Sequence, residues 1–442
     1  SSSSSSSTVA LQLRLEEAVT KLLVEGDAIG LQVSVFQHGV PVASVCGGTL
    51  GKADPRPVTP STLFNVFSVS KAVLAAGVMV LVDQGRIHLD DQISTHWPEF
   101  QAGANITVRH ALCHQAGLAG AQPSDATLDT LCDWEGMKAF VCKAQPDHEP
   151  GAEIKYHALS FGWICGGLIE AVTRQPYEAF LEEALFAPLG CSGDVRIGGV
   201  DASVASNRLA VLSKRLVRSS PTREKETRSG AENELAARTP LPPPPPVNSD
   251  DVLEGKEVEV VKTGKRRLEK YKANEALLNP SIFNMRKVRS AKLPAANGHA
   301  SARALASLMA ALSKPGVVLS REALEAARSP QTTTAQNNQR GGGGGGGAPL
   351  PKEGQGSKLL DNAGATFGLG FQLHALVLPD GSQCQSIGHS GLGGSLALAI
   401  PELGLSFALT SNLLEAQSTA RRVVVECIFE HLGVEAPASL LS

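Results

Sequence analysis

The chain reads SVSKAVLAAGVMVLV at residues 68–82, a serine and a lysine three positions apart followed by an almost unbroken apolar run. This stretch predicts a helix that is apolar on nearly every face, so we expect it to be buried in a domain interior. Ser68 would stand at the helix N-terminus, where free N–H groups and the helix dipole favour developing negative charge. Lys71 lies one turn on and projects from the same face. Because a buried lysine loses its proton readily, the pair offers a nucleophile and a base.

A Ser-x-x-Lys pair also has an ordinary interpretation, a helix cap followed by a solvated lysine, and on the order of one such pair is expected by chance in a chain of this length. The context favours catalysis. Residues 57–71 read PVTPSTLFNVFSVSK and closely resemble the first motif of the superfamily of class C β-lactamases, penicillin-binding proteins and esterases. The resemblance covers roughly residues 11–200 and 277–434. Further matching segments follow in the family's order at residues 81–91, 106–118, 367–371 and 388–395.

The segment YHALSFGW at residues 156–163 resembles most closely the β-lactamase-like domains fused to ABC1-type atypical kinases. Tyr156 follows a Pro-Gly turn and precedes an apolar helix, as does the family's catalytic tyrosine, which shares the serine proton with the lysine. The family asparagine two residues on, which helps bind β-lactams, is Ala158 here, and this weakens a β-lactamase assignment. The chain has no kinase motif of its own, so an ABC1-type kinase-like domain is expected only as a fused or associated partner.

Two segments compete for the family's third motif, Lys-Thr-Gly or His-x-Gly. Lys262-Thr263-Gly264 matches literally but lies in a charge-dense stretch that offers no buried edge strand. His389-Ser390-Gly391 follows an expected strand and precedes a glycine turn and two apolar strands, so we assign the motif there.

The resemblance then implies roles for three residues of this segment. Gly391 should let the substrate backbone come close, and the amides of Ser68 and Leu392 should form an oxyanion hole. His389 takes the place of a permanently cationic lysine that holds a substrate carboxylate. Since histidine is mostly neutral at pH 7, we expect a weak and pH-dependent grip on carboxylates.

Composition excludes several other functions. A net charge of −3 over 442 residues gives no electrostatic case for binding nucleic acid, and no apolar segment is long enough to predict a membrane span. The eight cysteines lack close-spaced pairs, which favours free thiols in a reducing compartment. His110 and His114 lack the glutamate of a zinc motif, and the glycine run 341–347 lacks the lysine of a phosphate-binding loop. We therefore predict no cofactor and no metal.

The alternating patterns near residues 31–45 and 371–409 predict antiparallel strands from the two ends of the chain that join in one sheet. We expect an α/β (α+β) fold of the β-lactamase/DD-peptidase type, an antiparallel sheet flanked by helices plus a mainly helical lobe. A single catalytic domain would span residues 9–434. Low-complexity insertions would interrupt it at 213–275 and 333–357, because neither stretch can form a packed core. Residues 1–8 comprise seven serines and Thr8, with no methionine, and are expected to be a disordered start of a fragment or processed chain.

These features predict a serine hydrolase that forms an acyl-enzyme on Ser68 with Lys71 and Tyr156, most simply an esterase or amidase acting on small substrates. A β-lactamase or D-Ala-D-Ala carboxypeptidase is the enzymatic alternative. A non-catalytic scaffold module of a larger fusion protein is the other. The sequence leaves the physiological substrate and the oligomeric state open.

Overall fold

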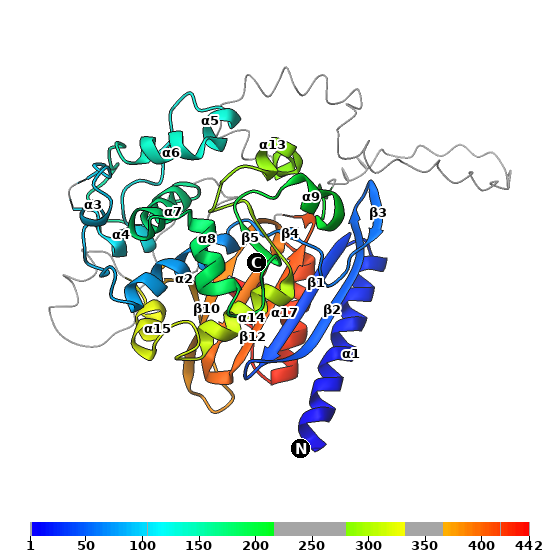
Figure 1. Cartoon of the computed structure of the whole chain (residues 1–442). Coiled ribbons are helices and arrows are strands. Elements are labelled where there is room, and N and C mark those ends of the chain that lie inside the picture. The colour runs from blue at the N-terminus through cyan, green and yellow to red at the C-terminus, as the bar shows by residue number, and fades with distance from the viewer. Residues whose placement is uncertain (1, 104, 216–279, 332–365, 416, 442) are drawn as a thin grey trace, which may run out of the picture.

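The computed structural model describes residues 2–103, 105–215, 280–331, 366–415 and 417–441. An eight-stranded antiparallel sheet organises them, in the order β3-β2-β1-β12-β11-β10-β9-β8 (Figure 1). This confirms the expected sheet. Its strands are β1 (Gly30–Gln37), β2 (Val40–Gly51), β3 (Asp54–Pro57), β8 (Thr366–Phe367), β9 (Gln372–Val377), β10 (Gln383–Ser390), β11 (Leu396–Ile400) and β12 (Leu405–Ser411).

The two ends of the chain meet in the middle of this sheet. β1 pairs antiparallel with β12, with Val33 opposite Leu409. The strands predicted near the N-terminus and near the C-terminus are therefore neighbours in the sheet.

Helices cover both faces of the sheet. On one face, α1 (Ser2–Val24), α17 (Thr419–Leu432) and α18 (Ala438–Leu441) pack against large apolar residues such as Phe407 and Leu409. On the other face, α14 (Ala302–Ser313) packs against β11, β12 and β1. The sheet offers small side chains to this second face, which allow the helix to come close. They include Ala397, Ala399 and Ala408.

The backbone of α1 is already helical at Ser2, which differs from the disordered start expected for residues 1–8. Serine alone is a modest helix former. Extension of an existing helix adds a hydrogen bond for each residue fixed, so the packed part of α1 around Leu15 and Leu22 carries the helix upstream.

A mainly helical lobe is inserted between the N-terminal strands and α14 and lies beside the sheet (Figure 1). Its central helix α2 (Val69–Asp83) has buried residues from Val69 to Leu81 without a break, as the apolar run predicts. Its other helical segments among the described residues are α3 (Ile93–His96), α4 (Val108–Leu112), α5 (Leu128–Cys132), α6 (Trp134–Val141), α7 (Ser160–Thr173), α8 (Tyr177–Leu181), η1 (Glu182–Phe186), α9 (Ala202–Arg208), η2 (Pro280–Asn284) and α13 (Arg286–Arg289). A further helix, α15 (Arg321–Arg328), follows α14 in the chain and packs against α2.

Short strands connect the lobe to the main sheet. β7 (Gly298–Ala300) lies between β4 (Phe64–Asn65) and β5 (Val195–Ile197). Because β4 ends three residues before Ser68, this small sheet sets the position from which α2 begins.

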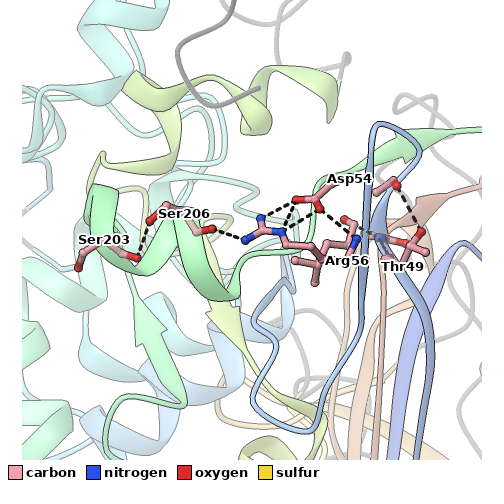
Figure 2. A network of polar contacts seen from close by, with 8 residues as sticks. Thr49, Asp54, Arg56, Ser203 and Ser206 are labelled. Carbon is pink, nitrogen blue, oxygen red and sulfur yellow. Dashed lines mark hydrogen bonds and ion pairs between the residues drawn. The ribbon is translucent and has the colours of Figure 1, made fainter. Parts of the chain in front are cut away.

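The edge strand β3 is tied to α9 by a polar network (Figure 2). Arg56 bonds to the carboxylate of Asp54, with Nη2 2.6 Å from Oδ2, and its Nη1 donates to the backbone oxygen of Ser206 at 2.7 Å. One guanidinium thus joins the sheet edge to the lobe.

Most of the two predicted insertions, and the literal Lys262-Thr263-Gly264 with them, lies outside the described residues. The first insertion was expected from residue 213, but Ser213 and Lys214 form strand β6, which pairs in parallel with β13 (Leu413–Leu414). On the other side, Asn284 bonds to Leu212 in both directions, at 2.9 and 2.8 Å. The chain around the first insertion is therefore anchored to the domain on both sides.

Candidate active site

Ser68 occupies the N-cap position of α2, but its side chain makes no capping hydrogen bond. The residue before it, Phe67, has a φ of 46°, which is unfavourable for an aromatic residue. The Asn65 side chain holds this conformation by accepting a hydrogen bond from the Phe67 amide at 3.0 Å. Strain of this kind persists where the surroundings enforce it, and it commonly marks functional sites.

Lys71 is completely buried, and its ammonium group points at the serine. Nζ donates to Ser68 Oγ at 3.1 Å and to the backbone oxygen of Ala295 at 3.0 Å. Burial lowers the pKa of Lys71 to about 7. The ordinary interpretation of this motif, a capping serine and a solvated lysine, is therefore wrong on both counts.

Tyr156 reaches the same serine from the loop before α7. Its hydroxyl donates to Ser68 Oγ at 2.8 Å, and its ring centroid lies 4.8 Å from Lys71 Nζ. Burial raises the pKa of Tyr156, and the hydrogen bond to Ser68 offsets only part of this effect. At neutral pH the phenol is protonated, so the group close to Ser68 that can exist in neutral, proton-accepting form is the Lys71 amine.

His114 holds the tyrosine in place. Its ring lies against the Tyr156 ring at 4.8 Å between centroids. Its backbone oxygen accepts from the Lys155 amide at 2.9 Å, and its Nδ1 accepts from the His157 amide at 3.2 Å. Both neighbours of Tyr156 in the chain are thereby held by one residue, His114, through its backbone oxygen and its ring nitrogen.

His389 lies at the end of β10 and is completely buried, with its ring centroid 6.3 Å from that of Tyr156. Its Nδ1 is 2.6 Å from the Ser390 backbone oxygen. Since a carbonyl oxygen only accepts, Nδ1 carries the hydrogen and Nε2 presents a lone pair. Burial, and next the nearby Lys71 charge, lower the pKa of His389 to about 3. The imidazole is therefore neutral at the mildly acidic and neutral pH values at which we expected its binding of carboxylates to vary with pH.

The segment after His389 lies directly against the residues before Ser68. A Cβ at Gly391 would lie 2.3 Å from the backbone oxygen of Val66, so only glycine fits. Leu392 follows in the short helix η3 (Leu392–Gly394). The structure thus brings the third motif to the N-terminal end of α2.

Sequence reasoning singled out Ser68, Lys71, Tyr156, His389 and Gly391, and the structure gathers them in one place. It missed three supporting groups. One is the backbone oxygen of Ala295, which accepts from Lys71. The turn that presents this oxygen is shaped by Asn297, whose side-chain amide donates to the backbone oxygens of Val288 and Ala291 at 2.7 and 2.9 Å.

The other two missed groups are His114 and Gln372. Gln372 Oε1 accepts from both the amide and the hydroxyl of Ser390, each at 2.8 Å. No motif contains these residues with their partners, because each acts on a segment distant in sequence.

Within the described ranges, no cluster of three or more His, Cys, Asp or Glu side chains could hold a metal ion. No helix there is long and apolar enough to cross a bilayer. All eight cysteines are free thiols, and Cys165 is close enough to Lys71 to influence its pKa.

Ser68 stands at the N-terminus of a buried helix and is hydrogen-bonded to Lys71, one turn on, and to Tyr156 from the loop before α7. This arrangement is that of a serine hydrolase site. The chain belongs to the Beta-lactamase family, whose model matches residues 15–425. It is a hydrolase of that family.

Known proteins similar to this chain include esterases and a penicillin-binding protein homolog. "Esterase/beta-lactamase LipL" of Mycobacterium tuberculosis (strain ATCC 25618 / H37Rv) is 28% identical over 398 residues, which cover 87% of this chain and 77% of the relative. A family VIII carboxylesterase structure has a TM-score of 0.68 at 22% identity, covering 96% of this chain and 98% of that chain. A penicillin-binding protein homolog from Caulobacter crescentus has a TM-score of 0.66 at 25% identity, with the same coverage.

Proposed function

We propose that this enzyme is a serine esterase or amidase for small substrates and that it works through an acyl-enzyme on Ser68. The observation that carries the proposal is the pair of hydrogen bonds that Ser68 Oγ receives, from Lys71 Nζ at 3.1 Å and from Tyr156 at 2.8 Å. A serine hydroxyl is a weak nucleophile unless a base takes its proton. Lys71, with its pKa lowered to about 7, is available as that base.

In the first half-reaction, neutral Lys71 takes the Ser68 proton while Oγ attacks the substrate carbonyl carbon. The bond from that carbon to the alcohol oxygen or amine nitrogen then breaks. Tyr156, which is protonated at the start, gives its proton to the leaving group and then takes up the proton that Lys71 received from Ser68. A water molecule repeats the attack on the ester of Ser68, with the same residues moving its proton, and releases the acid.

The developing oxyanion would be held by the amides of Ser68 and Leu392. Two observations support this assignment. Ser68 is the N-cap residue of α2. Gly391 lies against the backbone oxygen of Val66, which brings the Leu392 amide close to the segment that precedes Ser68.

Activity should follow the ionisation of Lys71. Below its pKa the amine is protonated and cannot accept the serine proton, so we expect kcat/KM for a neutral ester to fall about tenfold per pH unit below pH 6 and to level off above pH 8. Burial holds the pKa values of His114, His157 and His389 well below 6.5, so these histidines do not cause the decline of kcat/KM at acidic pH. A pH–rate profile with p-nitrophenyl butyrate checks this. A rate that is constant from pH 5.5 to pH 8.5 would contradict the assignment of the base.

The neutral His389 also predicts the charge of the preferred substrate. A charge-assisted contact to a carboxylate is missing here, and Ala158 removes a second β-lactam contact. We expect p-nitrophenyl butyrate to be cleaved with about tenfold to hundredfold higher kcat/KM than its carboxylate analogue, p-nitrophenyl hemisuccinate, and a chromogenic cephalosporin to be poorer still.

The preference should be equal at pH 6 and pH 8, because His389 stays neutral at both. Lys71 ionisation changes the rate for each substrate in proportion and cancels from the ratio. If the cephalosporin were hydrolysed with a higher kcat/KM than p-nitrophenyl butyrate at pH 8, the β-lactamase assignment would replace the esterase proposal.

Mass spectrometry of the intact protein after exposure to a fluorophosphonate and to a penicillin separates an esterase from a D-Ala-D-Ala carboxypeptidase. We expect a fluorophosphonate adduct that maps to Ser68. A stable penicillin adduct at Ser68 indicates a penicillin-binding activity, and no adduct with either reagent would contradict the assignment of Ser68 as the nucleophile.

An ABC1-type kinase-like partner also belongs to the proposal. It rests on the resemblance of residues 156–163 to domains fused to such kinases. Co-purification of the chain with a kinase-like protein of that type, expressed separately, tests whether the two associate.

A further inference from the structure

A second group of polar residues lies on the face of β9 and β10 that points away from α2. Side chains alternate along a strand, so His389 and Ile387 face one way while Ser386 and Ser390 face the other. Gln372 and His374 stand opposite Gly388 and Ser386 in the ladder and share that second face. The neighbouring positions on the same face, Leu376 and Cys384, pack in the core cluster that contains α17. These polar residues therefore lie in the layer between the sheet and its C-terminal helices.

Three of these side chains are buried with an unpartnered polar atom. Gln372, His374 and Ser386 are 1%, 4% and 0% exposed, and Gln372 Nε2, His374 Nε2 and Ser386 Oγ have no hydrogen-bond partner. The amide orientation of Gln372 is fixed, because its Oε1 must accept from the Ser390 amide. The unpaired group of Gln372 is thus an NH₂ with two hydrogens to donate.

Arg421 brings a positive charge to the same layer. It lies in the first turn of α17, one turn before Val424 and Val425, which are both buried in the core under that helix. Its Nε is buried without a partner, and it is close enough to His374 to lower the pKa of that imidazole. In the described part of the chain, Arg421 forms no ion pair, and burial is the one cause that lowers its own pKa. A partly buried guanidinium without a carboxylate is costly.

Every charged or amide group in this cluster donates hydrogen bonds, and none offers a carboxylate. His374 fits the same pattern when Ser439, 2.8 Å from its Nδ1, donates to that nitrogen and leaves Nε2 to carry a hydrogen. Water satisfies donors, but it brings two hydrogens that need acceptors of their own, and the cluster supplies few. An anion accepts from all of these groups and also compensates Arg421.

We propose that Gln372, His374, Ser386 and Arg421 form a binding site for a small anion, such as a halide or an inorganic oxyanion, on the side of β10 opposite the catalytic serine. The site is connected to the third motif. Gln372 donates from one end of its amide to the anion and accepts from Ser390 at the other, and Ser390 in turn accepts from His389. Occupancy should therefore stabilise the end of β10.

Thermal unfolding of the intact chain at constant ionic strength tests the site. Replacing sodium gluconate with sodium chloride, or separately with sodium sulfate or phosphate, should raise Tm saturably by about 2 °C for at least one of these anions. Arg421→Met should abolish this response. Arg422→Met is the matched control, because Arg422 is the exposed neighbour on the same helix, and that variant should respond as the wild type does.

A second variant guards against misfolding of the first. Gln372→Glu keeps an oxygen that accepts from Ser390 and adds a negative charge to the cluster, so it should fold and lose the anion response. Crystals grown with bromide should show an anomalous peak within hydrogen-bond distance of Gln372 Nε2 and Arg421 Nε. Absence of that peak together with an equal, non-saturating anion response in all variants would overturn the proposal and leave ordered water in the cluster. Both measurements are independent of whether the enzyme hydrolyses esters.

Discussion

Ser68→Ala should abolish acyl-enzyme formation. The substitution removes the one oxygen that Lys71 and Tyr156 both contact, and no neighbouring group can replace it as nucleophile in that position. Because the Ser68 side chain does not cap α2, its loss should leave the fold and Tm nearly unchanged. Intact-mass measurement with a fluorophosphonate, together with p-nitrophenyl butyrate hydrolysis, gives the result directly.

Ser70→Ala is the matched control. Ser70 is buried two residues on and bonds to the Phe67 oxygen and to the Gly298 amide, which lies 3.0 Å away. Its removal should cost about 1–3 kcal/mol of stability while the protein still becomes labelled at Ser68. Full esterase activity in Ser68→Ala would show that another residue is the nucleophile.

Lys71→Met should lower kcat/KM for esters by about two to four orders of magnitude, because the serine loses its base. Methionine is unbranched, is only one atom shorter than lysine and suits a fully buried site, so the protein should fold. The remaining activity should no longer decline below pH 7, since the group that titrates there is gone. The pH–rate profile distinguishes this chemical effect from a mere distortion of the site.

Two comparisons sharpen the interpretation of Lys71→Met. Lys155→Met changes an exposed lysine that is paired with Asp147 and should leave the rate and its pH dependence intact. Tyr156→Phe should slow acylation by a similar two to four orders of magnitude but keep the decline below pH 7, because Lys71 remains. A Lys71→Met enzyme with wild-type rate and pH profile would eliminate lysine as the base.

We expect the position of His389 to determine the substrate selectivity of the proposed esterase. The same residue would be a cation in solution at mildly acidic pH, but here burial removes its charge and the Ser390 oxygen determines its tautomer. A neutral acceptor in place of a cation disfavours carboxylate substrates at every pH at which the enzyme is folded and Lys71 is neutral. We therefore expect the charge of the preferred substrate to depend on the environment of the third motif and not on its residue type alone.

Local patterns were sufficient to predict the frame of this protein. The two-residue alternation near Val33 and Phe407 predicts strands, and the apolar run after Ser68 predicts a buried helix. The structure buries both faces of those two strands. The pairing of Ser68 with Lys71 is also local, because positions three apart face the same side of any α-helix. The order of motifs added Tyr156 and His389-Ser390-Gly391, whose placement depends on the resemblance to a known family.

Only the tertiary structure decided how these residues act. The pKa of Lys71 depends on complete burial, and the strain at Phe67 depends on Asn65, neither of which a motif records. The Ala295 oxygen, the His114 ring and the Gln372 amide each reach the site from a segment distant in sequence. Hydrogen bonds and desolvation act through space over a few ångströms, so the amino-acid sequence by itself determined which groups are candidates for the chemistry, while packing determined their charge, their tautomers and their partners.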